Sequence, residues 1–193
     1  MMPSELSVGV DFGTCWSSVA VRHSDAEGAR IDHVREKGSP SPSIPSAVAA
    51  GHDGQMVFGA RAWRRRGLPG MAAVEFKRDF GERATSQVGD EELSPFDLTA
   101  LFLGHLHGLA SELAGGSEAM AGATVTVTVP VGYTSPLREL MADAASRAGF
   151  AEVSILAEPV AGARLALSQT GVRSGELVMV YDLGGGTFDA ALM

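Results

Sequence analysis

Two glycine-containing turns, one near each end of the chain, carry the residue types best suited to chemistry. The first is Asp11-Phe12-Gly13-Thr14, which follows an apolar run. The second is Asp182-Leu183-Gly184-Gly185-Gly186-Thr187, which follows another apolar run. Both turns place aspartate, an apolar residue, glycine and threonine in the same order. The repetition predicts that one structural device is used twice.

Turns of this composition suit the binding of phosphate groups. Glycine lacks a Cβ, so a bulky ligand can approach the backbone, and consecutive N–H groups can form a concave anion site. The chain contains 24 glycines, so the Gly184-Gly185-Gly186 triplet by itself carries little weight. The flanking residues and the first copy carry the prediction. We favour two hairpins that grip a polyphosphate from both sides over two turns without a ligand.

The two aspartates occupy matching places, each at the end of the first strand of its hairpin. Magnesium prefers oxygen ligands and retains several waters, so Asp11 and Asp182 facing a phosphate pocket suit this ion. An aspartate that caps a turn is the alternative for either residue. Because the pattern occurs in both hairpins, we favour the metal site.

Two further charged residues are candidates for catalysis. Glu158 precedes Pro159 at the start of a predicted helix, where a carboxylate can orient or deprotonate water. The alternative is an acid that complements the helix N-terminus. Lys77 could offset the charge that builds on a transferred phosphoryl group. Its pattern alone favours the alternative, an ordinary surface lysine.

The elements that must position these residues alternate between strands and helices. Besides the two hairpins, at 6–22 and 177–192, apolar patterning predicts strands at 31–34, 46–50, 56–58, 123–130 and 153–156. Helices are predicted at 59–66, from Pro95 to the glycines at 115–116, from Ser135 to Gly149 and from Pro159 to Gly171. Residues 85–92 are polar and expected to be exposed. The alternation after Ala123 predicts an α/β sheet with crossover connections.

Composition limits the class of protein. The chain has 193 residues, enough for one domain or two small ones, and a formal net charge of −8 that argues against nucleic-acid or anionic-membrane surfaces. The single cysteine, Cys15, excludes an intramolecular disulfide and fits a reducing compartment. No apolar stretch reaches the ~20 residues of a membrane span, and no signal peptide opens the chain. We expect a soluble, cytoplasmic protein.

The order of these motifs resembles the actin, hexokinase and heat-shock chaperone superfamily of ATPases. The chain is most similar to the nucleotide-binding domain of the heat-shock protein 70 family. The residues that carry the resemblance are Asp11-Phe12-Gly13-Thr14, Phe76-Lys77-Arg78, Val129-Pro130, Leu156-Ala157-Glu158-Pro159 and the stretch from Asp182 to Asp189. They follow the family order over nearly the whole chain. No Walker A motif or dinucleotide fingerprint is present.

The resemblance implies a fold. It predicts an α/β, actin-like (ribonuclease H-like) ATPase lobe, in which a mixed β-sheet with two phosphate-binding β-hairpins is flanked by helices. Residues 1–193 would form the first lobe of the nucleotide-binding domain, with an outer subdomain inserted at about 36–122. The second lobe and the substrate-binding domain would be absent from this chain.

The resemblance also implies a role for each motif residue. Nucleotide phosphates would contact Gly13, Thr14 and Cys15 on one side and Gly184, Gly185, Gly186, Thr187 and Asp189 on the other. Asp11 and Asp182 would hold hydrated Mg²⁺. Catalysis would depend on Lys77, Glu158, Asp182 and Thr187.

The implied function is Mg²⁺-dependent binding and hydrolysis of ATP to ADP in a chaperone-like protein that assists protein folding. Unfolded polypeptides and co-chaperones would bind through regions outside this chain, which alone would be weakly active or inactive. Cys15-Trp16 replaces the small polar pair usual in the family, and Gly132 replaces an aromatic residue. These departures keep an alternative open, a non-catalytic, actin-like interaction or filament-forming module.

Overall fold

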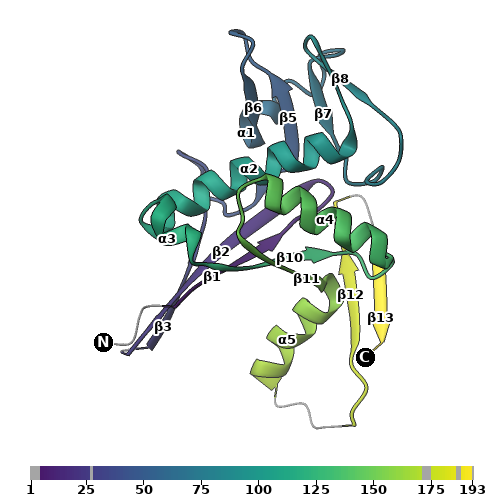
Figure 1. The fold of residues 1–193 in the computed structure, drawn as a ribbon. Helices are drawn as coiled ribbons and strands as arrows, with labels where there is room; N and C mark the ends of the chain where they lie inside the picture. The colour runs from purple at the N-terminus through teal and green to yellow at the C-terminus, as the bar shows by residue number, and fades with distance from the viewer. Residues whose placement is uncertain (1–4, 27, 171–174, 186–187, 193) are drawn as a thin grey trace.

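A mixed β-sheet forms the centre of the molecule (Figure 1). The structure is a computed structural model that describes residues 5–26, 28–170, 175–185 and 188–192. The sheet runs in the order β11–β10–β1–β2–β3, and the short strand β4 pairs with β2. Its strands are β1 (Glu5–Asp11), β2 (Trp16–Asp25), β3 (Gly28–His33), β4 (Ile44–Pro45), β10 (Thr124–Val129) and β11 (Glu152–Ala157). The predicted α/β class with a mixed sheet is confirmed.

The register of the parallel strands determines where the motif residues meet. Strand β10 pairs in parallel with β1, with Val10 opposite Val127, and also with β11, with Val127 opposite Ile155. The carboxyl ends of these strands therefore lie at one edge of the sheet. Asp11 ends β1 at this edge, and Glu158 follows β11 there. The antiparallel pairing of β1 with β2 returns the chain past the same edge.

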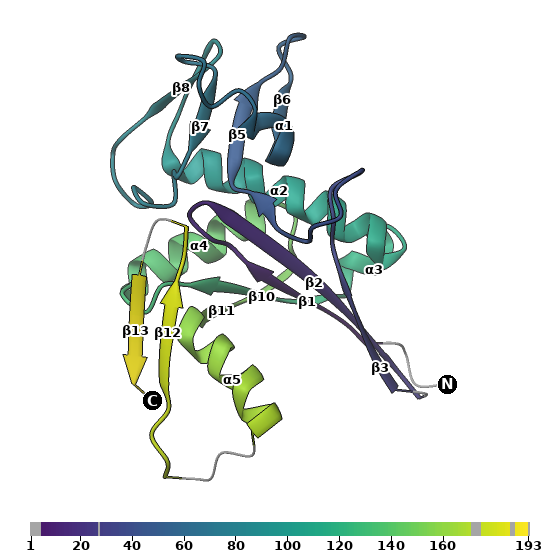
Figure 2. The ribbon, with the colours of Figure 1, turned by 180° about the vertical axis from the view of Figure 1, so that it is seen from behind.

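Helices cover both faces of the central sheet (Figures 1 and 2). Helices α2 (Pro95–Ala114) and α4 (Ser135–Arg147) lie on one face, and α5 (Glu158–Thr170) lies on the other; α3 (Ser117–Ala121) follows α2. The side chain of Ser94 accepts a hydrogen bond from the backbone N–H of Asp97, and Gly115 ends α2 with a φ of 96°. The predicted start and end of this helix are thus confirmed. No described helix combines the length and apolarity needed to cross a membrane.

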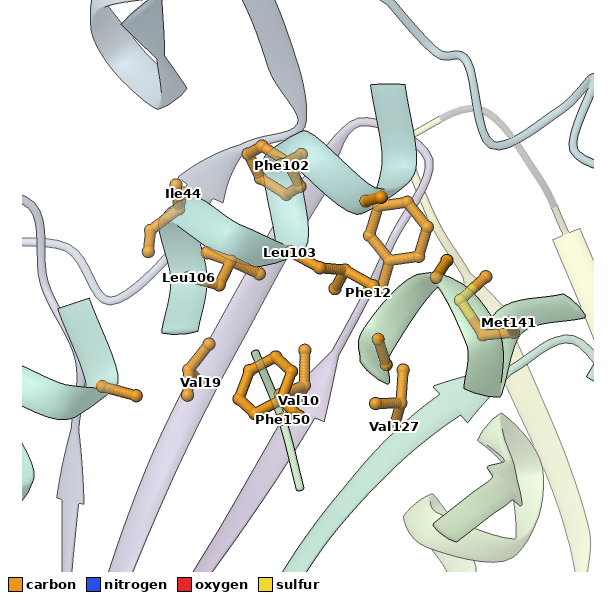
Figure 3. Packing of buried hydrophobic residues seen from close by; sticks show 14 of the residues in the cluster. Val10, Phe12, Val19, Ile44, Phe102, Leu103, Leu106, Val127, Met141 and Phe150 are labelled. Carbon is orange, nitrogen blue, oxygen red and sulfur yellow. The ribbon is translucent and has the colours of Figure 1, made fainter. Parts of the chain in front are cut away.

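The main hydrophobic core lies between the sheet and the helices α2 and α4 (Figure 3). The ring of Phe12, which is fully buried, lies 6.1 Å from that of Phe102 and 6.2 Å from that of Phe76. Burial of one such large side chain stabilises the fold by about 1.5–3 kcal/mol. The core therefore fixes Phe12, which stands between Asp11 and Gly13 in the first turn.

A second, smaller layer lies beyond α2 at the top of Figure 1. It contains the three-stranded sheet β6–β5–β7 and helix α1. Their bounds are Ala47–Ala50 for β5, Met56–Phe58 for β6, Gly59–Trp63 for α1 and Ala72–Val74 for β7. A separate cluster of buried residues holds this layer together: Ala47, Ala49, Val57 and Ala62. The boundaries of the outer subdomain, at about 36–122, stay a prediction.

Two sequence expectations for this layer were wrong in part. Residues 85–92 are mostly exposed, as expected, but Val88 is fully buried, and two strands that were not predicted, β8 (Ser86–Val88) and β9 (Glu91–Leu93), pair there. A strand of three residues is too short to show a period of two, which is why the pattern missed it. The helix expected at 59–66 ends at Trp63, and turns carry Arg64 to Arg66 onward.

The second hairpin forms a small sheet of its own. Strands β12 (Met179–Leu183) and β13 (Phe188–Leu192) pair antiparallel, with Asp182 opposite Asp189. In the described ranges, neither strand pairs with the central sheet. Strand β12 packs beside α5 instead. Many large apolar side chains of this hairpin and its approach are exposed: Leu177, Met179, Tyr181, Leu183, Phe188 and Leu192.

Candidate functional site

A cavity of about 530 Å³ lies between the two glycine-containing turns. It opens at the edge of the sheet where the parallel strands end. The predicted site residues that line it are Asp11, Gly13, Thr14, Cys15, Lys77, Glu158, Asp182, Gly184, Gly185 and Asp189. The structure therefore brings together residues from both ends of the chain and from its middle. Gly186 and Thr187, also predicted to bind phosphate, lie outside the described residues.

The first turn requires glycine at position 13, and hydrogen bonds to two serines hold this residue in place. A Cβ at Gly13 would lie 2.1 Å from the carbonyl oxygen of Trp16, which excludes every other residue at this position without a shift of the backbone. The N–H of Gly13 donates to Ser17 Oγ at 3.2 Å, and Ser46 Oγ donates to the carbonyl of Gly13 at 2.7 Å. Since a Cβ would face the backbone of Trp16 and the N–H is engaged, glycine at position 13 serves the shape of the turn itself.

The two turns touch across the mouth of the cavity. A Cβ on Gly185 would lie 2.8 Å from the Cβ of Cys15 and 3.5 Å from Cδ1 of Trp16. A residue with a side chain at 185 would push the turns apart. The contact places Gly185 of the second turn directly against the first turn.

Lys77 is buried, so the alternative of a surface lysine is excluded. The residue is 6% exposed, and its Nζ lies 5.2 Å from the centre of the Phe12 ring. Nζ donates to the carbonyl oxygen of Phe12 and to Glu158 Oε1, the latter at 2.7 Å. Removal of one partner from a buried ion pair costs about 3–5 kcal/mol, so each residue constrains the other. Lys77 thus lies against the first turn with its charge paired to Glu158.

Glu158 begins α5 directly after β11, at the edge where Asp11 also lies. Burial raises the pKa of Glu158; Lys77 opposes this by charge and by its hydrogen bond, and the charges of Asp11 and Asp182 raise the pKa further. A carboxylate that retains basicity beside a cavity can accept a proton from water or orient it. Its place in the first turn of α5 also fits the alternative of a helix-stabilising acid.

Two further side chains, Thr128 and Tyr133, contact the site residues, although the sequence did not predict this. Thr128 Oγ1 donates to Asp11 Oδ1 at 2.9 Å. The hydroxyl of Tyr133 lies 3.5 Å from the carbonyl oxygen of Lys77, and its ring stacks on Phe80 with centroids 6.0 Å apart. Burial raises the pKa of Tyr133 to about 12, and the charge of Glu158 adds to this shift. The alternation at 123–130 could not have distinguished Thr128 from its neighbouring threonines, because only the register of β10 against β1 places it beside Asp11.

Asp11 and Asp182 both line the cavity, as does Asp189. In the described part of the chain, no cluster of three or more His, Cys, Asp or Glu side chains could hold a metal ion by itself. An ion here would take oxygens from one or two carboxylates, from phosphate and from water, which is how Mg²⁺ binds beside nucleotides. The residues present therefore fit Mg²⁺ that arrives with a phosphate ligand.

Two of the three residues that depart from the family pattern, Cys15 and Trp16, line the cavity. Cys15 Sγ makes a weak hydrogen bond to Glu75 Oε1 at 4.0 Å. Burial, and then the charge of Glu75, raise the pKa of the Cys15 thiol, so it stays protonated and is not an activated nucleophile. Trp16 is 47% exposed, and its ring lies 5.8 Å from that of Trp63. Cys15 and Trp16 therefore narrow the opening of the cavity and add no reactive group to it.

Comparison with known proteins identifies the family. A family model described as "Hsp70 protein" matches residues 7–193. The chain belongs to the Hsp70 family. It is 32% identical over 194 residues to a "Chaperone protein DnaK" of Endomicrobium trichonymphae and 32% identical over 198 residues to one of Thermosipho melanesiensis. These matches cover 96% and 98% of this chain, respectively. The resemblance predicted from the motifs is confirmed.

The matched Hsp70 proteins are much longer than this chain. A "Chaperone protein DnaK" of Mycoplasma mobile is 29% identical over 192 residues, which is 100% of this chain and 30% of the relative. The two relatives above are matched over 29% and 30% of their length. The chain thus spans about 30% of the curated Hsp70 relatives that it matches.

Proposed function

We propose that this chain supplies one wall of the nucleotide site in an Hsp70-type chaperone that binds and hydrolyses ATP with Mg²⁺. The observation that carries the proposal is the buried Lys77–Glu158 pair, 2.7 Å apart, at the cavity between the two glycine-containing turns. A buried cation and a basic carboxylate beside a cavity that can hold a polyphosphate suit phosphoryl transfer to water. Membership of the Hsp70 family supports the same function.

Each residue then has a defined task. Gly13, Thr14 and Cys15 would approach the phosphates from one side and Gly184 and Gly185 from the other. Gly186 and Thr187, which lie outside the described residues, and Asp189 of β13 would also bind the phosphates. The Nζ of Lys77, held by the Phe12 carbonyl and Glu158, would stabilise negative charge on the transferred group. Glu158 would orient the attacking water and accept its proton.

Asp11 and Asp182 would hold the metal, and Asp189 of β13 would support it. When bound, Mg²⁺ would neutralise phosphate charge during the reaction. The residues offer carboxylates on both sides of the cavity, and the remaining ligands would come from phosphate and water. The chain itself therefore supplies only part of the coordination.

The rest of the protein would supply what this wall lacks. We propose that unfolded polypeptides and co-chaperones bind elsewhere in the full-length protein, in the cytoplasm, and that the protein assists folding during stress. The second candidate, a non-catalytic actin-like interaction or filament module, is favoured by one observation, the exposed apolar side chains of the β12–β13 hairpin. Sedimentation with and without ATP distinguishes the candidates, since only a filament module pellets in response to nucleotide.

ATP turnover by the natural full-length protein tests the catalytic proposal. We expect Lys77→Ala and Glu158→Ala each to lower kcat by at least about 100-fold, which is typical for loss of a charge-stabilising donor and of a positioned proton acceptor, respectively. Lys37→Ala is the matched control, because Lys37 is an exposed lysine away from the cavity, and it should leave kcat unchanged. Unchanged turnover in both site variants would refute the assigned roles.

A further inference from the structure

Thr128 is a buried residue with a hydroxyl directed at a carboxylate of the proposed metal site. Its Oγ1 lies 2.9 Å from Asp11 Oδ1 and 3.5 Å from the carbonyl oxygen of Val10. A threonine hydroxyl has one proton to donate. The shorter contact, to an acceptor that carries charge, receives it. Thr128 therefore donates to Asp11.

The fold explains why this threonine, and not its neighbours, reaches Asp11. Thr124, Thr126 and Thr128 alternate along β10, and the pairing of Val127 with Val10 places Thr128 beside the end of β1. Thr128 is 8% exposed, whereas Thr124 is exposed and Thr126 is half-buried. Water therefore competes poorly for the Thr128 hydroxyl.

Asp11 needs such a partner because it is itself exposed. An exposed aspartate at a strand end is free to change its χ1 rotamer. The hydrogen bond from Thr128 occupies one carboxylate oxygen and leaves the other for an ion. Asp11 and Thr128 also line a second hollow of about 400 Å³, together with Glu158 and Asp182, so the hydrogen bond lies among the acids of the site.

We propose that Thr128 is a positioning residue that holds the Asp11 carboxylate in the orientation required for Mg²⁺-nucleotide binding. The inference rests on the proposed function. Partners that hydrogen-bond to metal ligands are known to tune metal affinity, and their loss typically costs 10- to 100-fold. Thr128 would act through Asp11 and would not touch the ion.

Three variants distinguish the effect of the Thr128 hydroxyl from the effect of the side-chain shape. Thr128→Val removes the hydroxyl and keeps the branched shape, and valine already fills the alternate positions of β10. Thr128→Ser keeps the hydroxyl and removes the methyl group. Thr126→Val is the matched control, because it makes the same change two residues earlier on the same face of the strand.

The first measurement is a calorimetric titration of the 193-residue chain with ADP at a series of Mg²⁺ concentrations. We expect Thr128→Val to raise the Mg²⁺ concentration for half-maximal enhancement of ADP binding by about tenfold. ADP binding without Mg²⁺ should not change. Thr128→Ser and Thr126→Val should stay close to wild type. An unshifted midpoint in Thr128→Val, or an equal shift in Thr128→Ser, would overturn the role of Thr128 but not the proposed function. If ADP binding by the wild-type chain did not depend on Mg²⁺, both the role of Thr128 and the proposed function would be overturned.

A second measurement does not depend on nucleotide. Three-bond NMR couplings report the χ1 angle of Asp11 in the free protein. We expect a single rotamer in wild type and in Thr128→Ser, and averaging over rotamers in Thr128→Val. Averaged couplings in the wild-type protein, or a single rotamer that survives in Thr128→Val, would show that Thr128 does not position Asp11.

Discussion

At the scale of single residues, the surroundings of Glu158 control its ionisation. Burial raises the pKa of Glu158, and the charges of Asp11 and Asp182 act in the same direction, while Lys77 opposes the shift. Because the folded pKa lies above the unfolded value, protonation of Glu158 favours the folded state. This contribution is complete below the ordinary glutamate pKa of about 4.3 and is lost as the pH rises through the folded pKa.

The resulting prediction concerns stability as a function of pH. Glu158→Gln stays neutral, so the free energy of unfolding of wild type should fall relative to this variant as the pH rises from about 4.3 through the raised pKa. Lys77→Met should extend the fall to higher pH, because the opposing charge is gone. Urea denaturation of the three proteins at a series of pH values measures the effect. Parallel stability curves for wild type and Glu158→Gln would contradict it.

At the scale of elements, the two turns work only if they can approach each other. Gly185 touches Cys15 and Trp16, and a Cβ at position 185 would come 2.8 Å from the Cβ of Cys15. We predict that Gly185→Ala weakens ADP binding several-fold because the turns separate. Cys15→Gly should restore binding in the double variant, since it removes the colliding side chain.

Binding by each variant can be measured by calorimetry, with thermal unfolding as a check that the fold is intact. Cys15→Gly alone is the control for the change of backbone freedom. If Gly185→Ala bound ADP as wild type does, the contact between the turns would have no role in the site.

The sequence predicted much of this arrangement where the pattern was local. The aspartates, the glycines and the strands around them follow from short motifs, and the start of α2 at Pro95 follows from its local sequence. The Lys77–Glu158 contact joins residues 81 positions apart, so only a family resemblance could relate them. Thr128 looks like its two neighbouring threonines, and only the strand register distinguishes it. Strands β8 and β9 were too short for periodicity to reveal them.

At the scale of the whole molecule, the chain forms one sheet-centred body with a hairpin at its side. The central sheet carries Asp11, Thr128 and Glu158 on neighbouring strand ends, and the core beneath α2 holds Phe12 in place. The β12–β13 hairpin faces this edge from a separate small sheet and exposes apolar side chains. A nucleotide in the cavity would contact the two parts together, so its binding should restrict the hairpin.

The central claim is that both glycine-containing turns bind one Mg²⁺-nucleotide. The most direct test is a titration of the ¹⁵N-labelled chain with ADP and Mg²⁺, followed by backbone amide NMR. We predict that the amides of Gly13, Gly184 and Gly185 shift together, with a Kd near ~1 mM because half a cleft buries little of the ligand. The amide of Gly54, in an exposed turn of the outer sheet, should not move. Shifts in only one turn, or in neither, would contradict the claim.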